Sequence, residues 1–154
     1  MNIEQAAAFY YFESIHGGAL IDAAMQSLLD GVASEHLISL ASETDTAMAT
    51  VAPLFEVCLK ELGLDSKTRE QHSIEVAKFY ATQFLSGDMD AESFGFKVGA
   101  VANYDSAPEI LKEIYKNAVW HDECATEYGY ADDYLATRKE CEKRITELGK
   151  VLCA

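Results

Sequence analysis

Glu13 and His16 stand three residues apart in the stretch Glu13-Ser-Ile-His16. Glu and His at this spacing share one face of a helix and bind metal in di-metal carboxylate bundles. Such sites also need a second Glu-x-x-His and two further inward Glu residues, and this sequence contains no second Glu-x-x-His. His16 precedes Gly17-Gly18, a pair that is typical of a helix end. We therefore expect a surface histidine here and no metal.

His121 and Cys124 form a second pair at helical spacing. A helix would bring both side chains within reach of one zinc ion, which would still need two more ligands. Glu127 or Cys141 could serve, but nothing in their spacing requires it. We expect Cys124 to be a small buried apolar residue and His121 to be partly exposed. The sequence therefore predicts no metal site.

Signatures of catalysis are also missing. The chain has four Cys and four His, but no Gly-x-Ser-x-Gly elbow or oxyanion loop accompanies a Cys–His nucleophile pair. Gly95-Phe-Lys-Val-Gly99 is not a phosphate loop, because it lacks the Gly-Lys-Ser/Thr ending and a preceding strand. We interpret its glycines as positions of close helix packing. The sequence predicts no catalytic residue and no cofactor, and we do not expect an enzyme.

Charge is distributed unevenly along the 154 residues. The first Lys or Arg is Lys60, and the preceding 59 residues carry −8 of the net charge of −14. Such a field destabilises the fold through self-repulsion and favours encounter with a basic partner. It argues against nucleic acid and anionic membranes as partners, since both reward Lys and Arg. The carboxylates before Lys60 are Glu4, Glu13, Asp22, Asp30, Glu35, Glu43, Asp45 and Glu56.

A second stretch without Lys or Arg runs from Asn117 to Thr137 and mixes carboxylates with aromatic residues, including Trp120. Tyr and Trp are the usual anchors of protein contacts, so this stretch is our candidate partner-binding surface. A solvated acidic face is the alternative interpretation. The residues assigned to partner binding are Asp122, Glu123, Glu127, Tyr128, Tyr130, Asp132, Asp133 and Tyr134.

Apolar residues recur at helical spacing, and no clean strand alternation is found. The clearest stripe, over 46–62, holds Val51, Leu54, Phe55, Cys58, Leu59 and Leu62. Tyr10 and Tyr11 lie on another and are expected in the core. We predict an all-α fold, one compact domain over 1–154 with about eight helices joined as antiparallel hairpins, in a bundle or a short α-solenoid-like array. The expected helices cover 3–15, 19–30, 34–41, 46–62, 67–86, 90–102, a segment from Ser106 that Gly129 interrupts, and 131–148.

The N-terminus and the longest apolar runs bear on location. The chain starts Met-Asn-Ile-Glu-Gln, without the basic region and apolar core of a signal peptide. No run approaches the roughly 18 apolar residues of a membrane span. We therefore expect a cytoplasmic protein whose cysteines, Cys58, Cys124, Cys141 and Cys153, are free thiols.

Three stretches carry a family resemblance. They are Ser27-Leu-Leu-Asp-Gly31 running into 34–41, then 54–63, then Phe84-Leu-Ser-Gly-Asp-Met-Asp90. Their order is similar to that in small, acidic, all-helical immunity proteins found beside bacterial polymorphic and contact-dependent toxins. The resemblance covers roughly residues 20–100 and consists of helix-and-turn patterns. Phe84 departs from it, because the family usually has an aliphatic residue there.

The resemblance implies a non-catalytic protein that binds and neutralises one cognate toxin, and it transfers no site residues. A nuclease toxin needs a basic substrate groove, which an acidic surface bearing tyrosines could cover. Two alternatives stay open. One is a helical adaptor or oligomerisation module without a toxin, and the other is a metal-binding helical protein or an enzyme. The oligomeric state is left open.

Overall fold

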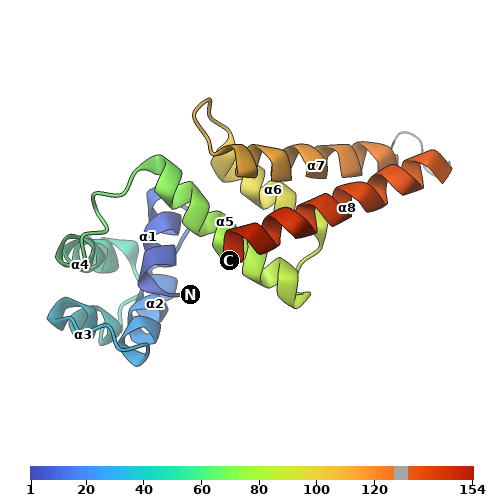
Figure 1. Ribbon diagram of the computed structural model, residues 1–154. Coiled ribbons are helices and arrows are strands. Elements are labelled where there is room, and N and C mark those ends of the chain that lie inside the picture. Colours follow the sequence, from blue (N-terminus) through green and yellow to red (C-terminus); the bar gives the residue numbers. More distant parts are fainter. Residues whose placement is uncertain (127–131) are drawn as a thin grey trace. The chain divides into compact units, whose positions relative to one another are not determined.

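The computed structural model describes the backbone of residues 1–126 and 132–154, and side chains within 1–124 and 135–154. These described residues form eight α-helices and no strand, which confirms the all-α prediction (Figure 1). The helices are α1 Ile3–Tyr11, α2 Gly17–Leu29, α3 Glu35–Ala41, α4 Met48–Glu61, α5 Arg69–Ser86, α6 Ala91–Ala102, α7 Glu109–Thr126 and α8 Asp132–Cys153. Among the described residues, no helix is both long enough and apolar enough to cross a membrane.

The chain divides into two compact units, an N-terminal unit of residues 1–72 and a C-terminal unit of residues 73–154. Each unit has a buried apolar cluster of its own, one within residues 3–64 and the other within residues 77–152. Burial of these clusters supplies the main favourable term in folding. That the whole chain behaves as a single domain stays a prediction.

In the N-terminal unit, α2 packs against α1, α3 and α4, and α3 packs against α4. Its largest fully buried side chains are Leu20, Leu37, Leu40, Val51 and Phe55. Polar caps fix where the helices begin. The Ser34 hydroxyl accepts a 3.1 Å hydrogen bond from the Leu37 amide at the start of α3, as its sequence position predicts.

The predicted end of the first helix is wrong. We expected a helix to Ile15 that Gly17-Gly18 would terminate, but α1 ends at Tyr11 and Gly17 begins α2. Gly17 is required for steric reasons, since a Cβ there would overlap the carbonyl oxygen of Thr46. Its absence of a side chain therefore allows the chain before α4 to lie against the start of α2.

In the C-terminal unit, α7 packs against both α6 and α8 (Figure 1). The interpretation of the α6 glycines as sites of close packing is confirmed. A Cβ on Gly95 would overlap the Cβ of Ala118, and one on Gly99 would overlap the ring of Tyr115. The largest fully buried side chains here include Phe94, Leu111, Ile114 and Ile145.

Candidate functional site

Glu13 and His16 do not share a helix face. Glu13 lies after the end of α1 with a φ of 53°, and His16 is the N-cap of α2. The Nδ1 atom of His16 accepts a 3.2 Å hydrogen bond from the Ala19 amide. Both residues are exposed, and the spacing that pointed to metal chemistry spans a turn instead of a helix.

His121 is buried, with 4 % of its surface exposed, so the expectation of a partly exposed histidine is wrong. Its Nδ1 atom lies 3.2 Å from Oε2 of Glu92, and its Nε2 atom lies 2.9 Å from Oε1 of Glu142. Both contacts are hydrogen bonds when the ring carries a proton on each nitrogen. The ring thereby joins α6 to α8. Cys124, predicted to be buried, is half-buried.

These two carboxylates face opposite nitrogens of the imidazole, so they are arranged around a bridging histidine and do not converge on one point with it. Among the residues that the structure describes, no group of three or more His, Cys, Asp or Glu side chains could hold a metal ion. What His121 provides here is a polar link between helices inside the C-terminal unit.

The predicted partner-binding stretch falls mostly outside the described side chains. Asp122 is half-buried and Glu123 is exposed, both on α7. The other six assigned residues, Glu127, Tyr128, Tyr130, Asp132, Asp133 and Tyr134, have side chains outside the described residues. Trp120, earlier on α7, is 53 % exposed, and the Lys116 ammonium lies 5.9 Å from its ring centroid. The assignment of this stretch stays a prediction.

The carboxylates before Lys60 lie on the surface of the N-terminal unit. Seven of the eight are exposed, and Glu43 is half-buried. In this fully described part of the chain, only Glu4 of the eight lies within ion-pair distance of a Lys or Arg, with its Oε2 atom 3.5 Å from Lys67 Nζ. Eleven Asp and Glu against three Lys and Arg give residues 1–72 a net charge of −8.

Local hydrogen bonds hold two carboxylates of this unit in their charged form. Asp45 accepts from the Thr50 hydroxyl at 2.6 Å and from the Ala47 amide at 3.0 Å, and these bonds lower its pKa. Glu61 accepts from the Ser34 hydroxyl at 2.6 Å and lies 2.8 Å from His36 Nδ1, which lowers its pKa in the same way. Hydrogen bonds to a carboxylate favour its ionised state, so both groups contribute to the negative field at neutral pH.

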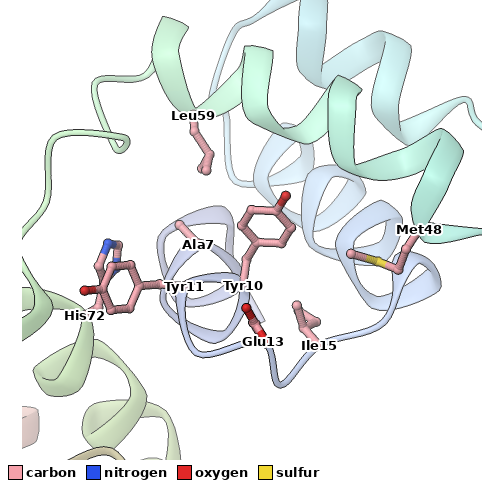
Figure 2. Close-up of a pocket in the computed structure, with 8 residues that line it drawn as sticks. All are labelled: Ala7, Tyr10, Tyr11, Glu13, Ile15, Met48, Leu59 and His72. Carbon is pink, nitrogen blue, oxygen red and sulfur yellow. The ribbon is translucent and has the colours of Figure 1, made fainter.

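A pocket of about 610 Å³ opens beside the turn between α1 and α2 (Figure 2). Tyr11 is 47 % exposed, which corrects its expected place in the core, and its ring stacks on that of His72 with centroids 4.5 Å apart. Figure 2 shows Tyr10 between Leu59 and Glu13. The lining residues are Ala7, Tyr10, Tyr11, Glu13, Ile15, Met48, Leu59 and His72, and they include no Lys or Arg.

Tyr10 connects the pocket to α4. Its hydroxyl donates a 2.8 Å hydrogen bond to Oε1 of Glu56, and its ring meets that of Phe55 edge-on with centroids 5.1 Å apart. Burial raises the pKa of Tyr10, and the hydrogen bond and negative charge of Glu56 raise it further. The ring therefore stays neutral and fixed at the pocket wall over the physiological pH range.

Glu13 occupies a backbone position that normally belongs to glycine. The Glu13 amide donates to the Tyr10 carbonyl and the Ser14 amide donates to the Phe9 carbonyl, each at 3.0 Å, which is a Schellman motif. The same motif ends α2, α4 and α5, where the left-handed residues are Gly31, Gly63 and Gly87. A residue with a Cβ pays roughly 1–2 kcal/mol in this conformation. The strain at Glu13 therefore lies at the edge of the pocket.

The sequence does not predict this pocket, because its lining residues come from separate segments of the chain. Tyr10 and Tyr11 are adjacent and point about 100° apart around a helix, so one core cannot bury both fully. This adjacency was the one sequence feature that could have indicated an exposed tyrosine at the end of α1. Glu13 is predicted only as a metal-ligand candidate and as one of the carboxylates before Lys60, and nothing in its sequence context predicts a left-handed conformation.

Comparison with known proteins finds no matching family model, no significantly similar curated protein and no significantly similar solved structure. Two features stand out in the described residues, the acidic surface of the N-terminal unit and the tyrosine-lined pocket within it.

Proposed function

We propose that this chain is a non-catalytic inhibitor that binds a basic protein through the acidic surface of its N-terminal unit. The supporting observation is the set of eight carboxylates before Lys60, seven of them exposed and one with a cationic partner. Repulsion among them disfavours the folded state, and the same field attracts a positively charged partner over long range. Their accumulation is easier to explain by binding than by folding.

The resemblance to immunity proteins indicates the class of partner, a cognate bacterial toxin. A nuclease toxin fits best, because its substrate groove must be basic to hold a polyanion. An acidic surface that covers such a groove excludes the substrate without any chemistry of its own. Electrostatic attraction makes the association fast and sensitive to salt, and buried contacts set the rate of dissociation.

Co-expression with the protein encoded by the adjacent gene tests this proposal. We expect the neighbour alone to stop growth, the pair to grow, and the two proteins to purify together. A harmless neighbour, or a toxic one that this chain neither binds nor neutralises, would contradict the proposal.

A matched pair of variants localises the interaction. The first, Asp22→Asn, Asp30→Asn and Glu35→Gln, removes three exposed charges that take part in no described ion pair. The second removes three exposed charges from the C-terminal unit, also outside the described ion pairs, by Asp88→Asn, Asp105→Asn and Glu109→Gln. Both change the net charge equally, so growth should fail with the first and persist with the second.

Exposed apolar side chains favour a second candidate function, a helical adaptor that binds apolar surfaces or itself. Leu29 at the end of α2 is 77 % exposed, and Trp120 on α7 is exposed as well. Single exposed apolar side chains are also common on monomeric proteins, so we rank this candidate below the inhibitor. Solution mass measured over a range of concentrations tests this candidate, because self-association would appear as a mass above 17.0 kDa.

A further inference from the structure

We infer that the pocket beside the α1–α2 turn binds an arginine side chain of the basic partner. The inference rests on the proposed function, since it names the group through which a basic protein would anchor to the acidic unit. Tyr10, Tyr11 and Glu13 would form the recognition surface.

The pocket has suitable size and access. Its volume of about 610 Å³ falls within the range of small-molecule sites, roughly 300–1,000 Å³. That is more than one side chain fills, so the backbone next to the arginine can enter as well. Tyr11 and Met48 are partly exposed at its edge, and Glu13 is exposed. A side chain of another protein can therefore reach the rings without unfolding any element.

The lining matches the two parts of an arginine side chain. Ile15, Met48 and Leu59 offer apolar surface for the methylene stem, which long cationic side chains bury while the charged end stays polar. Tyr10 and Tyr11 also line the pocket, and a planar guanidinium stacks on aromatic rings. His72 covers one face of the Tyr11 ring, so the guanidinium would use the other face or the Tyr10 ring. A lysine ammonium is more strongly hydrated and does not stack, so arginine fits these walls better.

The charges around the pocket favour a cation. Glu13 supplies a carboxylate at the edge, and Glu56 lies behind the Tyr10 hydroxyl. His72 is the one lining residue that can carry a positive charge, and its ring stacks on Tyr11. Arg69, at the start of α5, already places its guanidinium 6.0 Å from the ring centroid of Phe12. The aromatic end of α1 thus carries the type of contact that we assign to the pocket.

The conformation of Glu13 is consistent with this role. Glycine would fill the left-handed position without a steric cost, as it does at the ends of α2, α4 and α5. Strained backbone conformations cluster at functional sites, where a residue is retained for binding although it lowers stability. The carboxylate of Glu13 fits this pattern. Glu13 would pair with the guanidinium at the pocket edge.

The direct test uses N-acetyl-arginine amide as a probe and N-acetyl-citrulline amide as its neutral isostere. Each is titrated into the isotopically labelled full chain, and backbone amide shifts are followed by NMR. We expect the arginine probe to shift the amides of Tyr11, Glu13 and Leu59, with an affinity about tenfold above that of citrulline, which corresponds to about 1.4 kcal/mol. Equal affinities, or shifts away from the pocket, would overturn the inference.

Two variants separate binding from folding. Glu13→Gln keeps the shape and the backbone strain but removes the charge, so arginine affinity should fall to the level of citrulline. Met48→Lys puts a cation at the pocket edge on a partly exposed residue, and it should abolish arginine binding while thermal unfolding stays unchanged. Arginine binding that survives both substitutions would contradict the inference.

The two proposals fail in different ways. Neutralisation of the adjacent toxin by a chain that does not prefer arginine over citrulline would overturn the pocket assignment and leave the inhibitor proposal supported. A clear preference for arginine in a chain that neither binds nor neutralises the neighbour would contradict the inhibitor proposal and support the pocket as a guanidinium site.

Discussion

The Tyr10 hydroxyl donates a 2.8 Å hydrogen bond to the Glu56 carboxylate, joining α1 to α4 across 46 residues of sequence. This bond places a ring at the wall of the pocket and a negative charge directly behind it. It also ties a part of the acidic surface to the buried structure. The pKa of Tyr10 is raised above its ordinary value of 10.0 by burial and then by Glu56.

Tyr10→Phe should remove this bond and lower the free energy of unfolding by about 0.5–1.5 kcal/mol, a typical net value for one hydrogen bond. The folded state holds the Tyr10 proton more tightly than the unfolded state does. The associated stability is therefore fully present below pH 10 and is lost as pH rises through the folded pKa. Urea unfolding at pH 8 and pH 10.5 measures both effects.

Tyr80→Phe provides the control for Tyr10, because burial alone raises the pKa of Tyr80. Absorbance titration should show one late-titrating tyrosine fewer in each variant. When combined with Glu56→Gln, Tyr10→Phe should change the free energy of unfolding non-additively, because the two residues are in contact. Tyr80→Phe combined with Glu56→Gln should be additive. Additive effects of Tyr10→Phe and Glu56→Gln would show that the bond does not contribute to stability.

Glu13→Gly should stabilise the chain by about 0.5–1 kcal/mol, because glycine adopts the left-handed conformation without strain but loses more entropy on folding. Gly31→Ala is the reciprocal control. No atom lies within 4 Å of a Cβ built on Gly31, which has a φ of 91°, so its loss of roughly 1–2 kcal/mol would come from the backbone alone. Urea midpoints give both values, and a destabilised Glu13→Gly would contradict the strain argument.

Gly95→Ala should destabilise the C-terminal unit by about 1–3 kcal/mol, the usual cost of overpacking. The new Cβ would overlap the Cβ of Ala118, which cannot rotate away, and would lie 3.4 Å from the Ile114 carbonyl oxygen. Gly99→Ala should cost less, because the ring that it meets belongs to the partly exposed Tyr115. Thermal unfolding should rank the two variants in this order, and equal losses would disprove the packing account.

Burial, and then the charge of Glu61, raise the pKa of the Cys58 thiol from 9.0 to about 11. The folded state therefore favours the neutral thiol, which stabilises the protein fully below pH 9 and progressively less between pH 9 and 11. Cys58→Ala should reduce the loss of stability over this interval, measured as the shift in urea midpoint. Cys153→Ala removes an exposed thiol. This variant should lose as much stability between pH 9 and 11 as the unmodified chain does. Identical pH dependence in both variants would contradict the assignment.

Elements with local signals were predictable from the sequence. Ser34 and Asp90 were expected to begin helices, and each accepts a hydrogen bond from the amide three residues later, Leu37 and Ser93. The expected helices 19–30, 46–62 and 67–86 stop directly before Gly31, Gly63 and Gly87, and each of these glycines takes the left-handed conformation at the end of its helix. Caps and left-handed glycines act within a few residues, so their effect can be read without knowing the rest of the fold.

Features that depend on distant residues were not predictable. His121 is buried because Glu92 and Glu142, 29 and 21 residues away, satisfy both ring nitrogens. The pocket combines residues of α1 with Met48, Leu59 and His72, and no sequence pattern links these residues to one another. Only the fold brings such residues together, and a single sequence without an alignment does not report their proximity.

The most direct measurement is the dissociation constant of the complex between this chain and the protein encoded by the adjacent gene, determined at several salt concentrations. Charges farther apart than roughly 10 Å are screened at 0.1 M salt. The unmodified chain and the variant that lacks three charges in the C-terminal unit should weaken alike as salt rises. The Asp22→Asn, Asp30→Asn, Glu35→Gln variant should bind more weakly, with a shallower salt dependence. Affinity that is independent of salt, or equal in the two triple variants, would contradict binding through the acidic N-terminal unit.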